Sequence, residues 1–331
     1  MKTLLAVDGG NSKTDLALVA EDGALLGFAR GPQSSPHHIG EDGCLAVLEE
    51  LLARARAQAR IDGTSLATLC MAGVDFPAEE ERLAQLVAAR GWADRTRVLN
   101  DTFAILRAGT EQGWGIAIVC GAGINCVGVA PDGRQVRFPA LGAITGDWGG
   151  GYDVGLAAVS KAARSFDGRG PKTTLESTVP AHFGLTTPYE LAEAIHSKQI
   201  PERRVVELPP LVFAEATRDA VAAEIVDRLA AEIVALARAA LVRLELAGEA
   251  VEVLLGGGLV QGGDGRVVST VERGLGSVGP QIAVRVNAPP PVVGAALLGL
   301  DELGASPAAQ ARLRAELSAA AGNDAGGSSD G

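Results

Sequence analysis

Residues 6–16 read AVDGGNSKTDL, and this stretch determines how the rest of the chain is interpreted. An apolar run ends in Asp8, two glycines follow, and small polar or cationic residues precede the next apolar run. Apolar runs on both sides of a glycine turn are typical of a β-hairpin. A tight turn that exposes backbone N–H groups and hydroxyls is suited to phosphate oxygens. The stretch therefore predicts a hairpin whose turn can bind an anion.

The residues that follow predict the rest of an α/β unit. A third strand is expected at 24–30, after the Asp22-Gly23 turn, which makes an antiparallel meander. Apolar spacing then predicts helices at 41–60, 79–90 and 102–109, separated by strands at 66–71 and 96–99.

A second copy of this pattern begins at Gly115. Residues 115–138, GIAIVCGAGINCVGVAPDGRQVRF, again combine strand, glycine turn, strand, Asp-Gly and strand. The offset of about 110 residues is one domain length. A helix at 219–246 and strands at 251–255 and 282–286 are expected to continue this copy.

The repeat predicts two α/β domains. The first is expected at 1–112, completed by a helix at 291–304, and the second at 113–290. Residues 305–331 are rich in small and polar residues and are expected to form a disordered tail.

Composition excludes several classes of function. A formal net charge of −11 argues against a nucleic acid partner. No segment approaches the ~18–20 apolar residues of a membrane span, and the apolar start is too short for a signal sequence. We therefore expect a cytoplasmic protein without a membrane partner.

The four cysteines do not have the spacing of a metal site. None belongs to a CxxC pair, and the CGAGINC pair alone is a poor iron–sulfur signature. Buried, reduced thiols are expected at Cys44, Cys70, Cys120 and Cys126.

Three glycine segments together resemble a known set of nucleotide-binding motifs. AVDGGNSKTDLALV, VCGAGINCVGV and VLLGGGLV resemble the phosphate-1, phosphate-2 and adenosine motifs of the actin, hexokinase and heat-shock ATPase superfamily. A P-loop GxxxxGK[ST] is absent from the sequence, as is a GxGxxG opening a helix after the first strand.

With GDWGGGYDVG, these motifs are similar to the N-acetylglucosamine kinase family, which includes glucosamine kinases and is related to the BadF/BadG/BcrA/BcrD-type activator ATPases. The resemblance covers about residues 3–303. It implies a duplicated ribonuclease H-like, actin-like ATPase fold with an interdomain cleft.

The resemblance also implies that MgATP binds at the glycine turns, with Asp8 orienting the hydrated Mg²⁺. The implied nucleotide-binding residues are Asp8, Gly9, Gly10, Asn11, Ser12, Lys13 and Thr14 in the first turn, Gly121, Ala122 and Gly123 in the second, and Gly256, Gly257 and Gly258 in the third.

Asp101 has two interpretations. Its place between a strand and a helix is typical of a helix N-cap. The end of a strand is also where α/β folds place ligand groups. The resemblance matches Asp101 to the catalytic base that takes the proton from the attacking sugar hydroxyl, and one residue could serve both roles.

Asp147 could likewise be a helix cap, and the resemblance makes it an acceptor of hydrogen bonds from sugar hydroxyls. The implied substrate-binding residues are Ser35, Asn100, Asp101, Gly123, Asn125, Gly146 and Asp147. Two positions differ from the family pattern: Trp148 replaces an acidic residue, and Ser35 or a neighbour replaces an asparagine.

The function implied is an ATP-dependent amino-sugar kinase, which transfers the γ-phosphate to the 6-hydroxyl of N-acetylglucosamine or glucosamine and forms a homodimer. Two alternatives remain open. An activator ATPase of the benzoyl-CoA reductase and 2-hydroxyacyl-CoA dehydratase type would need cysteines that bind a cluster between two subunits. A non-catalytic sugar sensor on the same fold would be expected to lack the base at Asp101.

Overall fold

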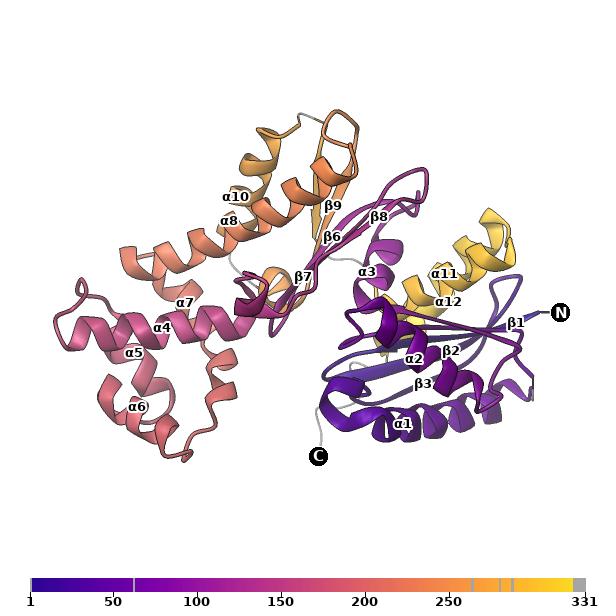
Figure 1. Ribbon diagram of the computed structural model, residues 1–331, viewed down its shortest axis with the longest axis horizontal. Helices are drawn as coiled ribbons and strands as arrows, with labels where there is room; N and C mark the ends of the chain where they lie inside the picture. Colours follow the sequence, from indigo (N-terminus) through magenta and orange to yellow (C-terminus); the bar gives the residue numbers. More distant parts are fainter. Residues whose placement is uncertain (1, 62, 263–264, 280, 287–288, 324–331) are drawn as a thin grey trace. The chain divides into compact units, whose positions relative to one another are not determined.

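The computed structural model describes residues 2–61, 63–262, 265–279, 281–286 and 289–323. These residues fold as two compact units (Figure 1). Unit 1 takes the described residues of 1–114 and 288–331, and unit 2 those of 115–287. In this part of the chain, no helix has both the length and the apolar character needed to cross a membrane.

Unit 1 is built on a five-stranded sheet with strand order β3-β2-β1-β4-β5. The hairpin strands β1, β2 and β3 are antiparallel, and β4 and β5 run parallel to β1. The strands are β1 (Thr3–Gly9), β2 (Lys13–Ala20), β3 (Leu25–Pro32), β4 (Leu66–Met71) and β5 (Arg95–Asn100).

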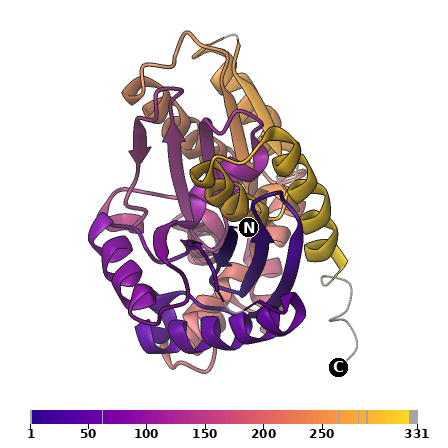
Figure 2. The same cartoon turned by 90° about the vertical axis from the view of Figure 1, so that its right-hand side faces the viewer.

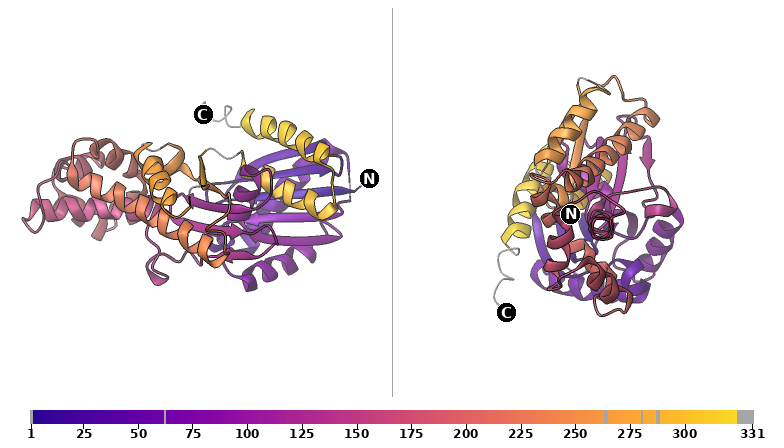
Figure 3. Two further views of the ribbon diagram at one scale, coloured as in Figure 1. Left: turned by 90° about the horizontal axis from the view of Figure 1, so that it is seen from above. Right: turned by 90° about the vertical axis from the view of Figure 1, so that its left-hand side faces the viewer.

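Helices cover both faces of this sheet (Figures 2 and 3). One face packs against α1 and α2, and the other packs against α3 and α11, with α12 beside α11. The helices are α1 (Pro36–Ala59), α2 (Pro77–Ala88), α3 (Asp101–Gly109), α11 (Pro291–Leu303) and α12 (Pro307–Asn323).

Unit 2 repeats this sheet with strand order β10-β9-β6-β7-β8. Again three strands form an antiparallel meander, and the other two run parallel to its first strand. The strands are β6 (Gly115–Cys120), β7 (Ile124–Val129), β8 (Gln135–Arg137), β9 (Glu252–Gly256) and β10 (Ala283–Val286).

Unit 2 also carries a helical region, in which α5, α6 and α7 pack around α4 (Figure 1). The helices and 3₁₀ turns of the unit are η1 (Gly142–Ile144), α4 (Gly150–Phe166), α5 (Leu175–His182), α6 (Pro188–His196), η2 (Glu202–Glu207), α7 (Pro209–Glu215), α8 (Ala220–Arg243), α9 (Gly258–Gln261) and α10 (Gly265–Gly276).

The predicted duplication is confirmed by the two sheets, since β1 to β5 correspond in order and direction to β6 to β10. This is the duplicated ribonuclease H-like arrangement of actin-like ATPases. The predicted strand at 66–71 is β4, whereas the helix predicted at 41–60 begins earlier, at Pro36. Gly40, with φ 74°, interrupts the helix there, and this break explains why apolar periodicity starts at 41.

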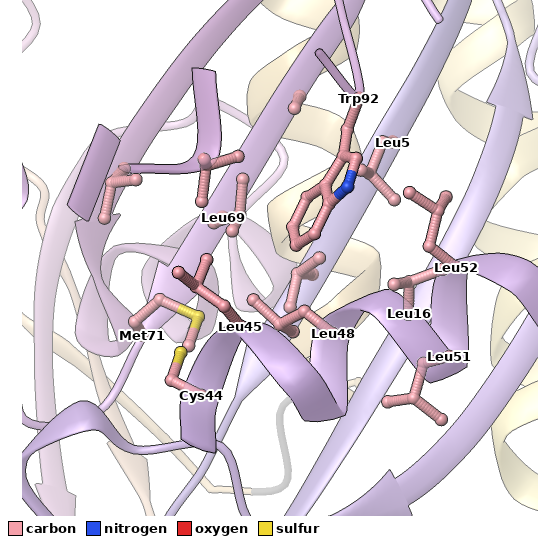
Figure 4. Close-up of a cluster of buried hydrophobic side chains, with 14 of the residues drawn as sticks. Leu5, Leu16, Cys44, Leu45, Leu48, Leu51, Leu52, Leu69, Met71 and Trp92 are labelled. Carbon is pink, nitrogen blue, oxygen red and sulfur yellow. The ribbon is translucent and has the colours of Figure 1, made fainter. Parts of the chain in front are cut away.

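The core of unit 1 shows which sheet face carries which side chains (Figure 4). Leu5 and Leu16, from β1 and β2, pack with the apolar stripe of α1. Successive side chains of a strand point to opposite faces. Asp8 and Asp15 therefore lie on the other face, toward α3 and α11. The stripe of α1 consists of Cys44, Leu45, Leu48, Leu51, Leu52 and Ala55.

The expectation of a disordered tail from residue 305 is wrong for 307–323, which form α12. Leu313 and Leu317 are fully buried, and the Glu316 carboxylate accepts a hydrogen bond from the Leu25 N–H at 2.8 Å. Apolar residues recur every fourth position, but most neighbours are alanines, so composition concealed the stripe. Residues 324–331 lie outside the described part of the chain.

We predict that Leu317→Ala lowers the free energy of unfolding by about 2–4 kcal/mol, because it leaves a cavity under α12. Denaturant unfolding measures the change. Val242→Ala serves as the control, since Val242 is 61% exposed and its truncation should cost far less. Equal losses for the two variants would contradict the docking of α12.

Candidate functional site

Carboxylates gather at one edge of the unit 1 sheet. Asp8 lies near the carboxyl end of β1, Asp75 follows β4, and Asp101 follows β5. Because these strands are parallel, their carboxyl ends meet at the same edge. The Asp75 charge acts on Asp101, and the Asp101 charge acts on Asp8. Three acidic side chains, from β1, from the loop after β4 and from the start of α3, thus form one electrostatic cluster.

Asp8 is 8% exposed, and burial raises its pKa to about 8. The charges of Asp101 and Asp15 contribute to this raised pKa, while Lys13 and Arg30 act against the shift. Such a carboxyl group is held in a surplus of negative charge, which a divalent cation would offset.

Asp101 is the first residue of α3, and burial together with the Asp75 charge raises its pKa to about 6. The charge of Asp101 in turn helps to raise the pKa of Asp8. A carboxyl group with a pKa near 6 is ionised at neutral pH and remains basic enough to accept a proton.

The alternative that Asp101 caps α3 is wrong, because Asn100 is the cap. The Asn100 Oδ1 accepts hydrogen bonds from the Thr102 N–H at 3.1 Å and from the Thr102 hydroxyl at 2.5 Å. Its Nδ2 donates to Val74 O at 3.1 Å and to Asp75 Oδ1 at 3.0 Å. The side chain of Asn100 thus joins the loop after β4 to the start of α3, and its predicted contact with substrate stays a prediction.

The first glycine turn is shaped by close packing. A Cβ on Gly9 would lie 2.4 Å from the Met71 methyl carbon and 2.7 Å from Ser34 Oγ, so these side chains pack closely against the backbone of Gly9. The Gly10 N–H donates to Lys13 O at 2.9 Å and closes the turn. Asn11, Ser12 and Lys13 are exposed beyond it. Backbone and side-chain donors of this turn are available to an anion.

Thr14 does not fit the prediction of a phosphate-binding side chain. It is fully buried, and its hydroxyl donates to Pro32 O at 2.7 Å and lies 2.8 Å from Ser34 Oγ. Thr14 pairs with Gly9, one residue beyond Asp8, and so points to the face opposite Asp8. Its role is to fix the loop after β3 against the hairpin.

Ser35 lies in that loop, at the N-cap of α1, and is fully buried. Its Oγ has no hydrogen-bond partner within the described residues. A Cβ on Gly73, whose φ is +72°, would come within 2.6 Å of this oxygen. Substrate binding by Ser35 stays a prediction, since the side chain is closed off from solvent.

The glycine segments of unit 2 converge on one another. The Gly151 N–H donates to Gly121 O at 2.8 Å, and the Tyr152 N–H donates to Ala122 O at 2.9 Å. A Cβ on Gly150 would lie 2.4 Å from Gly123 O. The turn at 121–123 is therefore held against the start of α4, with Ala122 and Gly123 left exposed.

The third glycine segment meets the same turn. Gly256 ends β9 and pairs with Val119, and Gly257 has φ +90°. A Cβ on Gly257 would lie 2.2 Å from Cys120 O, a contact that no other residue could tolerate. Gly258 begins α9 and is exposed. Within unit 2 the second and third predicted nucleotide motifs are thus adjacent.

The predicted sugar residues of unit 2 lie beside this turn. The start of α4 is capped by Gly149, and so the alternative of Asp147 as a cap is wrong. The Asp147 carboxylate instead accepts from the Thr145 hydroxyl, and its N–H donates to Gly142 O at 3.0 Å. The exposed Gly146, with φ +81°, belongs to the same bend. These contacts order the segment that carries Asp147.

Asn125 and Trp148 flank that segment differently. The half-buried Asn125 accepts a hydrogen bond from the Cys126 N–H at 2.7 Å through Oδ1. The Arg228 guanidinium of α8 stacks over the Trp148 ring at 4.0 Å from its centroid. Trp148, the residue that departs from the family pattern, therefore fastens the Asp147 segment to α8.

Metal binding at Asp8 requires other ligands besides the protein. Among the described residues, no group of three or more His, Cys, Asp or Glu side chains is arranged to hold an ion. Magnesium commonly takes one or two carboxylates and completes its shell with water and phosphates. The carboxylate cluster around Asp8 fits an ion bound in that way.

The four cysteines are all buried in the two units. Burial raises the thiol pKa of Cys44 and Cys120 to about 12. Thiols enclosed in a core cannot ligate a cluster shared with a second subunit without unfolding around them.

Sequence reasoning missed Asp15, Arg30 and Asp75 as members of the site. The hairpin turn that pairs Gly9 with Thr14 also pairs Asp8 with Asp15, so the position of Asp15 beside Asp8 could have been predicted from the sequence. Asp75 could have been found from the parallel strands, whose carboxyl ends meet. The position of Arg30 could not be predicted from the sequence, because a register shift between Leu18 and Val19 sets how β3 pairs with β2.

Known proteins resemble this chain over most of its length. A curated N-acetylmuramic acid/N-acetylglucosamine kinase from Clostridium acetobutylicum is 28% identical over 264 residues, which cover 78% of this chain and 86% of that protein. An N-acetyl-D-glucosamine kinase from Dictyostelium discoideum is 27% identical over 226 residues, covering 64% of this chain and 70% of that protein.

Among solved structures, a proposed N-acetylglucosamine kinase from Chromobacterium violaceum has a TM-score of 0.69 with 22% identity, covering 90% of this chain and 99% of that chain. At this identity the likeness concerns the fold. The model of the BadF/BadG/BcrA/BcrD ATPase family matches residues 5–299, which include both sheets and all three glycine segments. The chain belongs to the BadF/BadG/BcrA/BcrD ATPase family.

Proposed function

We propose that the protein is an ATP-dependent amino-sugar kinase that transfers the γ-phosphate of MgATP to the 6-hydroxyl of N-acetylglucosamine or glucosamine. The observation that carries the proposal is the pair of the buried Asp8 and the half-buried Asp101 at the carboxyl edge of the unit 1 sheet, both with raised pKa values. The two curated relatives, both kinases of N-acetylated amino sugars by name, support it.

In the proposed site, nucleotide phosphates contact the exposed part of the first turn, at Asn11, Ser12 and Lys13. Asp8 holds the hydrated Mg²⁺, which offsets the charge of the phosphates. In unit 2, the exposed backbone of 121–123 and Gly258 takes the remaining nucleotide contacts. Thr14 contributes no side-chain contact, because its hydroxyl is used inside the protein.

The proposed chemistry is an in-line displacement. Asp101 accepts the proton of the sugar hydroxyl while that oxygen attacks the γ-phosphorus, and the bond from phosphorus to the ADP oxygen breaks. Asn100 fixes the start of α3, and Asp75 raises the pKa of Asp101. Asp147, Asn125 and Gly123 orient the sugar by hydrogen bonds.

The cysteine environments favour a kinase over an activator ATPase, since all four thiols are enclosed in cores. The presence of Asp101, with a pKa suited to a base, favours an enzyme over a sugar sensor. The homodimer and the cytoplasmic location stay predictions.

We predict that a screen of ADP release over hexoses and amino sugars gives the highest kcat/KM with N-acetylglucosamine or glucosamine.

We predict that Asp101→Asn lowers kcat about 10²–10⁴-fold, because the base is lost, and leaves the Kd of MgADP nearly unchanged. A sugar-free reaction supplies the blank. Near-normal turnover by the variant would remove Asp101 from the mechanism.

We predict that kcat/KM for the sugar falls as the pH drops below about 6, because Asp101 must be ionised and its pKa is about 6. Asp75→Asn removes the repelling charge and lowers the pKa of Asp101. The acidic limb of the pH–rate profile, where kcat/KM falls, should therefore move to lower pH. The pH–rate profile measures the shift. Asp132→Asn, at an exposed turn of unit 2, is the control and should leave the limb in place. A limb unmoved by Asp75→Asn would contradict the coupling.

We predict that Asp8→Asn raises the Tm of the ligand-free protein at pH 8 by a few degrees while phosphotransfer is lost. The folded-state pKa of Asp8, about 8, exceeds the ordinary aspartate pKa of 3.8, so ionisation of Asp8 destabilises the fold increasingly from about pH 4 to pH 8.

The gain in Tm should therefore shrink at pH 5. Calorimetry at the two pH values measures it, with Asp22→Asn as the control, since that carboxylate pairs with Arg312 at the surface. A variant less stable than the wild type at pH 8 would argue against an unfavourable charge at Asp8.

A further inference from the structure

A row of charged side chains crosses the first three strands of unit 1, and two of its members, Asp15 and Arg30, have no role in the proposed chemistry. Asp8 on β1 pairs with Asp15 on β2, and Asp15 pairs with Arg30 on β3. Directly paired residues of antiparallel strands place their side chains on one face of the sheet. Asp15 and Arg30 therefore lie on the same face as Asp8, next to the nucleotide turn.

We propose that Asp15, clamped by Arg30, is a positioning residue that holds the Lys13 ammonium where the phosphates of a nucleotide bind. The inference rests on the proposed use of ATP and names the residues that prepare the phosphate site.

Asp15 is fully buried, and both of its carboxylate oxygens accept hydrogen bonds. Arg30 Nε donates to Oδ1 at 2.6 Å, and Arg30 Nη2 donates to Oδ2 at 2.9 Å. Lys13 Nζ donates to the same Oδ2 at 3.0 Å. A bidentate guanidinium fixes the orientation of a carboxylate, so Asp15 presents Oδ2 to Lys13 in one direction.

The two cations differ in exposure. The Arg30 side chain is 17% exposed, whereas that of Lys13 is 49% exposed. Arg30 alone can neutralise Asp15. Lys13 thus brings an additional positive charge to the mouth of the turn, and it can bind phosphate oxygens without giving up Asp15.

The charge of the neighbourhood makes this cation important. Asp8, Asp75 and Asp101 gather at the sheet edge near this turn, and like charges repel at close range. Lys13 and Arg30 act on Asp8 in the opposite sense. A lysine in an exposed turn normally samples many rotamers, and binding would have to order it. Asp15 removes that cost before the nucleotide arrives.

The test is isothermal titration with MgADP and, separately, with adenosine, which lacks phosphates. Lys13→Met should weaken MgADP binding about tenfold, and Asp15→Asn should weaken it by a similar or smaller factor. Adenosine affinity should not change in either variant. The double variant should bind MgADP as Lys13→Met does, because Asp15 acts through Lys13.

Asp301→Asn is the matched control, since it removes the carboxylate of another Arg pair in unit 1, in which Arg107 Nε donates to Asp301 Oδ2 at 2.7 Å. It should lower Tm and leave the preference for MgADP over adenosine intact. Additive losses in the double variant, or equal losses for adenosine and MgADP, would overturn the proposal.

The Lys13 side chain is half exposed, so substitutions at Lys13 should leave the fold intact. They test the proposal even if Asp15→Asn does not fold. Lys13→Arg should bind MgADP within about threefold of the wild type, because the charge and the pair with Asp15 are kept. MgADP binding by Lys13→Met at the wild-type level would refute the proposal. A wild-type protein that binds no MgADP would instead refute the proposed function itself.

Discussion

Carboxylates packed beside one another in a protein interior repel, and unit 1 is organised around that repulsion. Asp8 can remain in a buried strand only because part of the charge nearby is cancelled, by Arg30 and Lys13 through Asp15. The loop that carries Asp75 and the helix that begins at Asp101 are tied together by Asn100, so the acidic groups cannot move apart. The fold supplies the rigidity, and the site uses it to keep an acidic cluster ready for a cation.

Much of this arrangement follows from the sequence, since local patterns give the strands and turns. The apolar runs in 3–9 and 13–20, separated by a glycine turn, predict the first hairpin, and the repetition of this pattern from Gly115 predicts the second sheet. The face of the sheet on which Asp8 lies could not be predicted in this way, because Leu4 and Ala6 are as apolar and as buried as Leu5 and Val7. Asp101 could be placed at a sheet edge from strand order alone.

Other features depend on contacts between distant segments. Thr14 looks like a phosphate ligand in the sequence, yet its hydroxyl is taken by Pro32 and Ser34 because strand alternation turns it away from Asp8. The choice of Asn100 over Asp101 as the cap of α3 depends on Val74 and Asp75, which no local pattern connects to it. The helix α12 was missed because alanines hide a short stripe whose partner is the hairpin.

The order of the elements along the chain has a consequence for synthesis. Unit 2 is continuous in sequence, whereas unit 1 is completed by α11, which returns to pack on β1, β4 and α3. A Cβ on Gly294 would lie 1.8 Å from Ala104 O, so this return is a close fit. While the ribosome is still translating, one sheet face of the first unit stays uncovered until residue 303 has emerged. The second unit can therefore fold before the first is closed, and a nascent chain interrupted before α11 exposes apolar surface to chaperones.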